Sequence, residues 1–236
     1  SPETDAALRY VLELQADDGS IRGQDRFPPI NSTTWYGSVM TAIAAADAPG
    51  WLTQTQDDAI ADRVQRLVDF LKTTPPKNDH EGLMLLWAST FLPELLIEER
   101  QQELIEMVWS HQRPDGGWSL RTFATPENIG GGRRGLSLKT DEHYLNPQSD
   151  GYQTGLSLIV LRAAGVSADD ARIQKGAHWL LANQRESGRW WTRSLNPTSR
   201  FHFISYSGTA YASLALARCG VLPVTEAGSD GAQPDP

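Results

Sequence analysis

The chain has few of the residues that bind structural metals or nucleic acids. Its 236 residues include one cysteine, Cys219, so an intrachain disulfide and a cysteine-rich metal site are excluded. Lys and Arg number 21 against 29 Asp and Glu, and with a net charge of -8 we expect no nucleic-acid partner, because phosphate binding needs a basic face. No apolar run approaches the roughly 18 residues of a membrane span. The 39% of hydrophobic residues instead indicates a globular domain with a sizeable core.

One short motif occurs three times along the chain. It consists of Gln, a Gly four residues later and a large apolar residue six residues after the Gln, in segments 15–21, 112–118 and 184–190. Each copy follows a segment with apolar residues at helical spacing and precedes a second segment that carries little charge. This periodicity is typical of an array of stacked helical hairpins.

Four hairpins are predicted, at about 4–47, 55–92, 97–165 and 169–219. The first helix of each pair is amphipathic and suits an outer layer, whereas the second is apolar nearly all round and suits an inner layer that is buried on both faces. The predicted fold is therefore all-α: one domain over residues 1–222, built as part of an α/α toroid or as an open crescent.

Three segments are predicted to lie outside the helices. The connections 119–149 and 191–204 are longer than turns, and loops of that length usually act as lids or binding loops or are disordered. The polar segment 223–236 is expected to be a disordered tail.

The second motif resembles the QW-type repeat of squalene-hopene cyclases and oxidosqualene cyclases. Its residues are Gln112, Asp115, Gly116 and Trp118, and a looser copy contains Gln184, Gly188 and Trp190. We expect these residues to be structural: Gln satisfies carbonyls at the end of an outer helix, Gly takes the positive φ that ends the helix, and Trp packs across neighbouring hairpins.

The resemblance implies that the inner helices surround an apolar cavity for an isoprenoid. Aromatic side chains in such a cavity stabilise carbocations by about 0.5 to 2 kcal/mol each, and packing in the core is the alternative for each of them. The candidate cavity residues are Trp35, Tyr36, Trp87, Asp150, Tyr152, Tyr206 and Tyr211.

Cyclisation of this kind also needs a strong acid. Squalene-hopene cyclases supply it from an Asp-x-Asp-Asp cluster, and no such cluster stands at a matching place here. The nearest substitute is Asp79-His80-Glu81 at the start of an inner segment, where a His beside an Asp would help to keep a carboxyl protonated. The alternative is a helix cap in which Asn78 and Glu81 are partners.

No metal and no other cofactor is predicted. Protein prenyltransferases hold zinc with Asp, Cys and His; the segment from Asp150 to Thr154 is similar to part of that site, but Gln153 stands where the His would be. Two features of the segment 119–149 remain. Arg133 and Arg134, flanked by glycines, are a candidate anion-binding loop, and the polar cluster 141–144 is either part of a lid or a solvated loop.

Together these features predict a domain that binds an isoprenoid or another apolar small molecule, as a cyclase-like enzyme or as a diverged relative. A lipid ligand would bring the domain to a membrane surface, and further N-terminal repeats would complete the ring. The alternative is a non-catalytic helical scaffold that binds a protein, peptide or glycan on its concave face. The sequence predicts no compartment.

Overall fold

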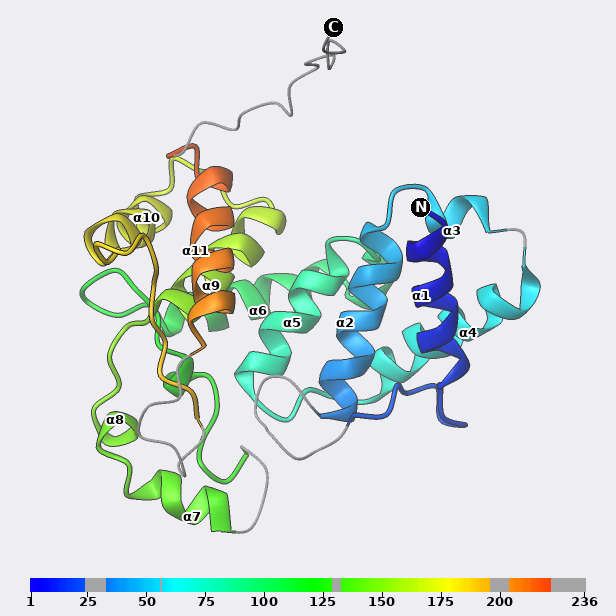
Figure 1. Ribbon diagram of the computed structural model, residues 1–236, viewed down its shortest axis with the longest axis horizontal. Coiled ribbons are helices and arrows are strands. Elements are labelled where there is room, and N and C mark those ends of the chain that lie inside the picture. Colours follow the sequence, from blue (N-terminus) through cyan, green and yellow to red (C-terminus); the bar gives the residue numbers. More distant parts are fainter. Residues whose placement is uncertain (24–32, 56, 129–132, 196–203, 222–236) are drawn as a thin grey trace, which may run out of the picture.

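Helices make up the fold in the computed structural model, which describes residues 1–23, 33–55, 57–128, 133–195 and 204–221 (Figure 1). Within these ranges no strand forms, and an isolated β-bridge joins Gln15 to Ile21. The all-α prediction is thus confirmed. The helices are α1 (Pro2–Glu13), α2 (Thr34–Asp47), α3 (Trp51–Gln54), α4 (Asp58–Thr73), α5 (Asp79–Ser89), α6 (Glu98–Ser110), α7 (Arg133–Lys139), α8 (Glu142–Leu145), α9 (Gly151–Ala163), α10 (Ala171–Ala182) and α11 (Ser205–Arg218), with 3-10 turns η1 (Pro93–Leu95) and η2 (Leu120–Thr122).

The long helices form two layers, as their sequence patterns predict. The prediction that every inner helix is buried on both faces is wrong for α11, which buries one face only, at Gly208, Ala212, Ala215 and Leu216. Outer helices α1, α4, α6 and α10 bury one stripe each, for example Leu67, Val68 and Leu71 of α4. Inner helices α5 and α9 are buried all round, because every residue of 80–89 and of 151–161 is buried. The inner helices therefore form the centre of the hydrophobic core.

Neighbouring hairpins share contacts across the layers. Helix α4 packs on α2, α6 on α5, and α10 on α9, so each outer helix covers the inner helix of the hairpin before it. Figure 1 shows the result: α1 lies at one end of the array and α10 with α11 at the other. The outer helices of the first and last hairpins, α1 and α10, therefore lie apart in this chain.

Side chains at the helix starts explain where several helices begin. Thr33, Asp57, Asn78 and Asp150 each accept a hydrogen bond from a backbone N–H in the first turn of the helix that follows. At α5, Glu81 N donates to Asn78 Oδ1 at 2.9 Å, and the Glu81 carboxylate accepts from the backbone of the preceding residue, with Lys77 N donating to Glu81 Oε2 at 2.7 Å. The cap interpretation of Asn78 and Glu81 therefore holds in the structure.

The prediction that 119–149 lacks structure of its own is wrong for its described part. This connection contains η2, α7 and α8, and its apolar side chains Leu120, Phe123 and Leu138 are each no more than 1% exposed. These side chains order the segment by entering the core. The other long connection is described up to residue 195, where Thr192 and Leu195 are buried. Residues 196–203 and the predicted tail 223–236 lie outside the described residues.

The segment 118–123 covers the N-terminal ends of α5 and α9. His80 N in the first turn of α5 donates to Phe123 O at 3.0 Å, and Asp150 N donates to Trp118 O at 2.9 Å. Asp150 in turn accepts from Leu120 N at 2.7 Å. The connection between α6 and α9 thereby ties two inner helices together at one end.

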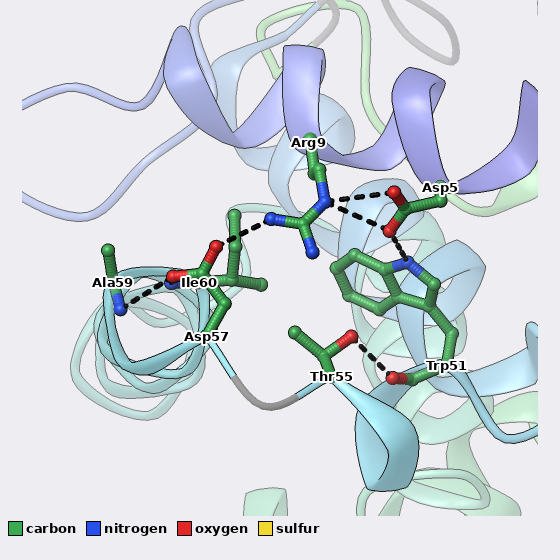
Figure 2. A network of polar contacts seen from close by, with 7 residues as sticks. All are labelled: Asp5, Arg9, Trp51, Thr55, Asp57, Ala59 and Ile60. Carbon is green, nitrogen blue, oxygen red and sulfur yellow. Dashed lines mark hydrogen bonds and ion pairs between the residues drawn. The ribbon is translucent and has the colours of Figure 1, made fainter. Parts of the chain in front are cut away.

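A polar network ties α1 to α3 and α4 (Figure 2). Arg9 donates from Nε to both carboxylate oxygens of Asp5 and from Nη1 to Asp57 at 2.6 Å, while the Trp51 indole donates to Asp5 at 2.9 Å. Every charged group in the network has a partner, so it is best understood as a structural contact. As for membranes, no described helix is both long and apolar enough to span one.

Candidate ligand-binding site

The repeated Gln joins successive outer helices. Gln112 Nε2 donates to Gly116 O at 3.0 Å within its own turn and to Arg172 O in α10 at 2.8 Å. Gln15 does the same with Gly19 O and with Arg63 O in α4, both at 2.9 Å. Gln15 and Gln112 therefore fix the position of the next outer helix through main-chain atoms.

The large apolar residue of the motif fixes the inner layer. Trp118 donates from its backbone N–H to Thr154 Oγ1 at 2.9 Å and from its indole to Val108 O at 2.8 Å. Trp190 repeats both contacts, with Thr209 Oγ1 at 3.3 Å and Leu180 O at 2.8 Å. Asp115 adds a link, because its carboxylate accepts from Gly117 N and from the Trp179 indole. These motif residues hold the hairpins together.

Five rings from the four inner helices meet at one place, here called the aromatic centre: Tyr36, His80, Trp87, Tyr152 and Tyr211. Tyr36 stacks with His80 at a centroid distance of 6.2 Å, and His80 lies 6.5 Å from Tyr152. Tyr211 makes edge contacts with Tyr152 at 5.1 Å and with Trp87 at 6.4 Å. The structure thus brings together four of the predicted cavity residues and one predicted catalytic residue.

His80 is an unusual residue for so apolar a place. It is 1% exposed, and neither ring nitrogen makes a hydrogen bond of good geometry among the described residues, although the Gln153 side chain lies beside the ring. Burial lowers the pKa of His80 to about 4, an effect that the neighbouring Gln153 side chain opposes in part. The imidazole is therefore neutral near pH 7, with one N–H donor and one acceptor nitrogen.

Other polar atoms in the same interior are also unpaired. Gln153 Nε2 donates to Ser157 Oγ at 3.2 Å, but Gln153 Oε1 and the Trp87 indole N–H are buried without a partner among the described residues. Burial raises the pKa values of Tyr36, Tyr152 and Tyr211, so their hydroxyl groups keep their protons. The aromatic centre therefore combines apolar ring faces with neutral hydrogen-bonding groups.

Two predicted cavity residues lie elsewhere. Trp35 is 3% exposed and donates from its indole to Thr74 O at 3.2 Å, which ties α2 to the end of α4. Tyr206 is 86% exposed, so the prediction that it lines the inner wall is wrong. It precedes Tyr211 by five residues, and five residues turn a helix by about 140° beyond a full turn, which points the two side chains to different sides.

The predicted acids are all engaged in other contacts. Asp79 is exposed and lies 2.8 Å from His111 Nε2, whose ring stacks on Phe123. Glu81 is buried in the α5 cap, and burial raises its pKa. Asp150 is also buried, which raises its pKa, and it accepts hydrogen bonds from Leu120 N, Gln153 N and Thr192 Oγ1.

Arg121 and Gln153 were not singled out as site residues. Arg121 is buried, which lowers its pKa; its guanidinium donates to Arg193 O at 3.1 Å and to Ser194 O at 3.2 Å, and the Asp150 charge helps to keep it protonated. Gln153 had one signal in the sequence: it is a long polar side chain in a helix that is otherwise apolar and small. Arg121 had none, because its partners lie more than 70 residues away.

The remaining candidates belong to the connection 119–149. Arg133 and Arg134 form the first turn of helix α7, and their side chains lie outside the described residues. Asp141 caps α8, and the Tyr144 hydroxyl donates to Ala124 O, so the cluster 141–144 stabilises the connection itself. Over the described ranges, no three His, Cys, Asp or Glu side chains gather as metal ligands.

No family model matches the chain, and no curated protein matches its sequence. Among solved structures, the chain is similar to a variant of the type II terpene cyclase MstE from Scytonema, in complex with its substrate geranylgeranyl dihydroxybenzoate. The two are 15% identical, the match covers 92% of this chain and 72% of the cyclase, and the TM-score is 0.40.

Proposed function

We propose that the aromatic centre binds an isoprenoid or similar apolar chain that carries one hydrogen-bonding group. The observation that carries this proposal is the meeting of rings from α2, α5, α9 and α11 around the unpaired polar atoms of His80 and Gln153. Ring faces suit an apolar or cationic chain. Tyr36 and Tyr211 are only half-buried, so part of each ring remains free to contact a ligand.

The unpaired atoms indicate the kind of polar group. A buried donor or acceptor without a partner costs about 1–3 kcal/mol, so each such group in a native protein calls for an explanation. A ligand hydroxyl would donate to Gln153 Oε1 or to the free His80 nitrogen and accept from the His80 N–H. A prenyl alcohol has this chemistry, whereas a pure hydrocarbon leaves the same atoms unpaired.

The proposal is one of binding in a cyclase-like domain. Proton-initiated cyclisation needs a strong acid aimed at the ligand. Asp79 is exposed, Glu81 and Asp150 are held by caps, and His80 is neutral. Any cyclisation would therefore use an acid other than these four residues.

A binding experiment tests the proposal with two related ligands. Geranylgeraniol and squalene are each presented in detergent micelles, and retention on the purified protein is measured by mass spectrometry and by quenching of tryptophan fluorescence. Tyr211→Ala should weaken retention of both ligands at least fivefold. His80→Phe and Gln153→Leu should weaken retention of the alcohol alone.

Tyr206→Ala is the matched control, because this exposed tyrosine lies on the same helix as Tyr211. It should leave retention unchanged. If neither ligand is retained by the unaltered protein, or if Tyr206→Ala and Tyr211→Ala act equally, the aromatic centre is not a ligand site. The scaffold alternative then becomes the better account of the fold.

A further inference from the structure

The last repeat turn lacks the neighbour that the other two turns have. Gln184 Nε2 donates to Gly188 O at 2.9 Å, as its equivalents do within their own turns. Gln15 and Gln112 each donate to a second acceptor, which lies in α4 for Gln15 and in α10 for Gln112. In the described part of the chain, Gln184 has no such second acceptor. The turn at Gln184 therefore lacks a main-chain carbonyl from a further outer helix.

Two further features of the turn give the same result. A Cβ added at Gly116 would lie 2.8 Å from Lys175 O of α10, and one at Gly19 would overlap Arg66 O of α4, whereas none at Gly188 would meet a neighbouring helix. The residue three positions before each Gln also differs: Leu12 is 0% and Trp109 is 8% exposed, but Leu181 is 41% exposed. The C-terminal edge, defined by Leu181, Gln184 and Gly188, is therefore open.

The covered turns define what would fit this edge. The Gln acceptors Arg63 and Arg172 each lie ten residues before the last residue of their outer helix. In α10, Gly176 then lies against Gly116 and the Trp118 ring, and the Trp179 indole donates to Asp115 of the turn. The fitting helix thus offers a carbonyl and, seven positions later, an aromatic residue, as Phe70 does in α4 and Trp179 does in α10. The residue four positions after the carbonyl is Leu67 in α4 and Gly176 in α10.

Helix α1 has these features at the same positions, on a face that its own chain leaves open. Ten residues before its end stands Glu3, followed at those spacings by Ala7 and Tyr10. All three are exposed, Tyr10 by 62%, and Leu14 on the same stripe is 54% exposed. This stripe of Glu3, Ala7, Tyr10 and Leu14 is the N-terminal edge.

The charges at the two edges are complementary. The first turn has Asp17 and Asp18 and docks on a helix whose contact residues are Arg63 and Arg66. In the last turn two of the three charged residues are basic: Arg185 and Arg189 lie on either side of Glu186, and Glu3 would stand at the position of Arg63. An acidic helix start therefore suits the C-terminal edge better than a basic one.

We infer that two copies of this chain associate head to tail, with the N-terminal edge of one seated on the C-terminal edge of the other. The two edges lie at opposite ends of the array, so they cannot meet within one chain (Figure 1). Such a contact is heterologous, joining different surfaces of the two copies. It would continue the stacking that already joins α1 to α4 and α6 to α10.

Two single variants test the contact, each blocking one edge. Tyr10→Asp removes the N-terminal edge and Leu181→Asp removes the C-terminal edge. By sedimentation velocity from about 1 to 100 µM, the unaltered protein should show a mass above the 26.0 kDa monomer at the upper concentrations. Each variant alone should stay monomeric, and an equimolar mixture should form dimers, because one intact edge of each kind remains.

The control is Ile97→Asp, an exposed apolar residue before α6 that belongs to neither edge, and it should associate like the unaltered protein. Circular dichroism checks that every variant folds. If the unaltered protein stays monomeric throughout the concentration range, the inference is overturned. That result is expected if a further hairpin of a longer chain covers the edge instead of a second copy. It is also overturned if either variant alone still associates, or if the mixture stays monomeric.

Discussion

The side-chain amide of Gln112 donates to the backbone carbonyl of Arg172, which lies 60 residues further along the chain and in another hairpin. The same amide also donates to Gly116 O four residues away. One side chain thus closes a local turn and sets the position of the next outer helix. Four predictions test how such contacts support the fold and the candidate site.

Gln112→Ala should lower the free energy of unfolding by about 1–2 kcal/mol, because two hydrogen bonds are lost, a part-buried one to Gly116 O and an exposed one to Arg172 O. Gln184→Ala removes one exposed bond and should lower it by less than about 0.5 kcal/mol. Urea denaturation followed by circular dichroism measures both values, at a concentration where the protein is monomeric. Equal losses would show that the bond to Arg172 adds nothing.

Gly116→Ala and Gly188→Ala form a second matched pair. Both glycines have positive φ, at 95° and 74°, so each substitution should cost about 1 kcal/mol through the backbone alone. At Gly116 the new methyl group would also collide with Lys175 O, which should raise the loss above about 2 kcal/mol. Thermal unfolding of the two variants should therefore differ clearly, and similar values would mean that α10 moves aside freely.

The stability of the protein should depend on pH through His80. Its pKa is about 4 in the folded state against 6.5 for a free histidine, so the unfolded chain binds the extra proton between these values. The free energy of unfolding should therefore be level above pH 6.5 and fall by about 3 kcal/mol as the pH drops to 4. His80→Phe should remove this part of the slope.

Trp87→Phe is the control for that experiment, because it alters the same aromatic centre without removing a titratable group. Its pH profile should run parallel to that of the unaltered protein. A His80→Phe profile that is also parallel would mean that His80 binds its proton as readily in the folded state as in the unfolded chain.

Asp150→Ala should destabilise the fold far more than Asp79→Ala. The first substitution leaves buried donors of Leu120, Gln153 and Thr192 without an acceptor, for a loss on the order of 3 kcal/mol. The second removes an exposed partner of His111, for which less than about 1 kcal/mol is expected. Chemical denaturation measures the free energy of unfolding of both variants.

A binding measurement tests Asp79 separately. Asp79→Asn should leave ligand retention unchanged, and a loss of retention would restore Asp79 as a site residue.

The sequence predicts the hairpins well because their signals are local. A Gln and a Gly four residues apart close one turn by themselves, and the charge-poor pattern around Tyr152 marks a helix that is buried all round. The prediction fails for the described part of the connection 119–149, since Leu120 and Phe123 are a single pair of large apolar residues and form no repeating core pattern. What orders them is contact with α5 and α9, elements that lie far away in the sequence.

The candidate site is only partly visible in the sequence. Tyr36, Trp87, Tyr152 and Tyr211 were predicted from their place on inner helices, and the structure brings their rings together. Which face of a helix points inward depends on how neighbouring helices pack. For that reason His80 and its neighbour Asp79 separate, one entering the aromatic centre and the other pairing with His111 at the surface.

The Gln contacts have a consequence for how this chain could change over time. Gln15 and Gln112 each donate to a main-chain oxygen of the next outer helix, an atom that every amino acid has. The Gly of the same turn leaves room for the main chain of that helix. Substitutions of outer-helix side chains would leave this contact intact, provided that the segment remains helical. A protein assembled in this way tolerates extensive sequence drift while its hairpins stay in register.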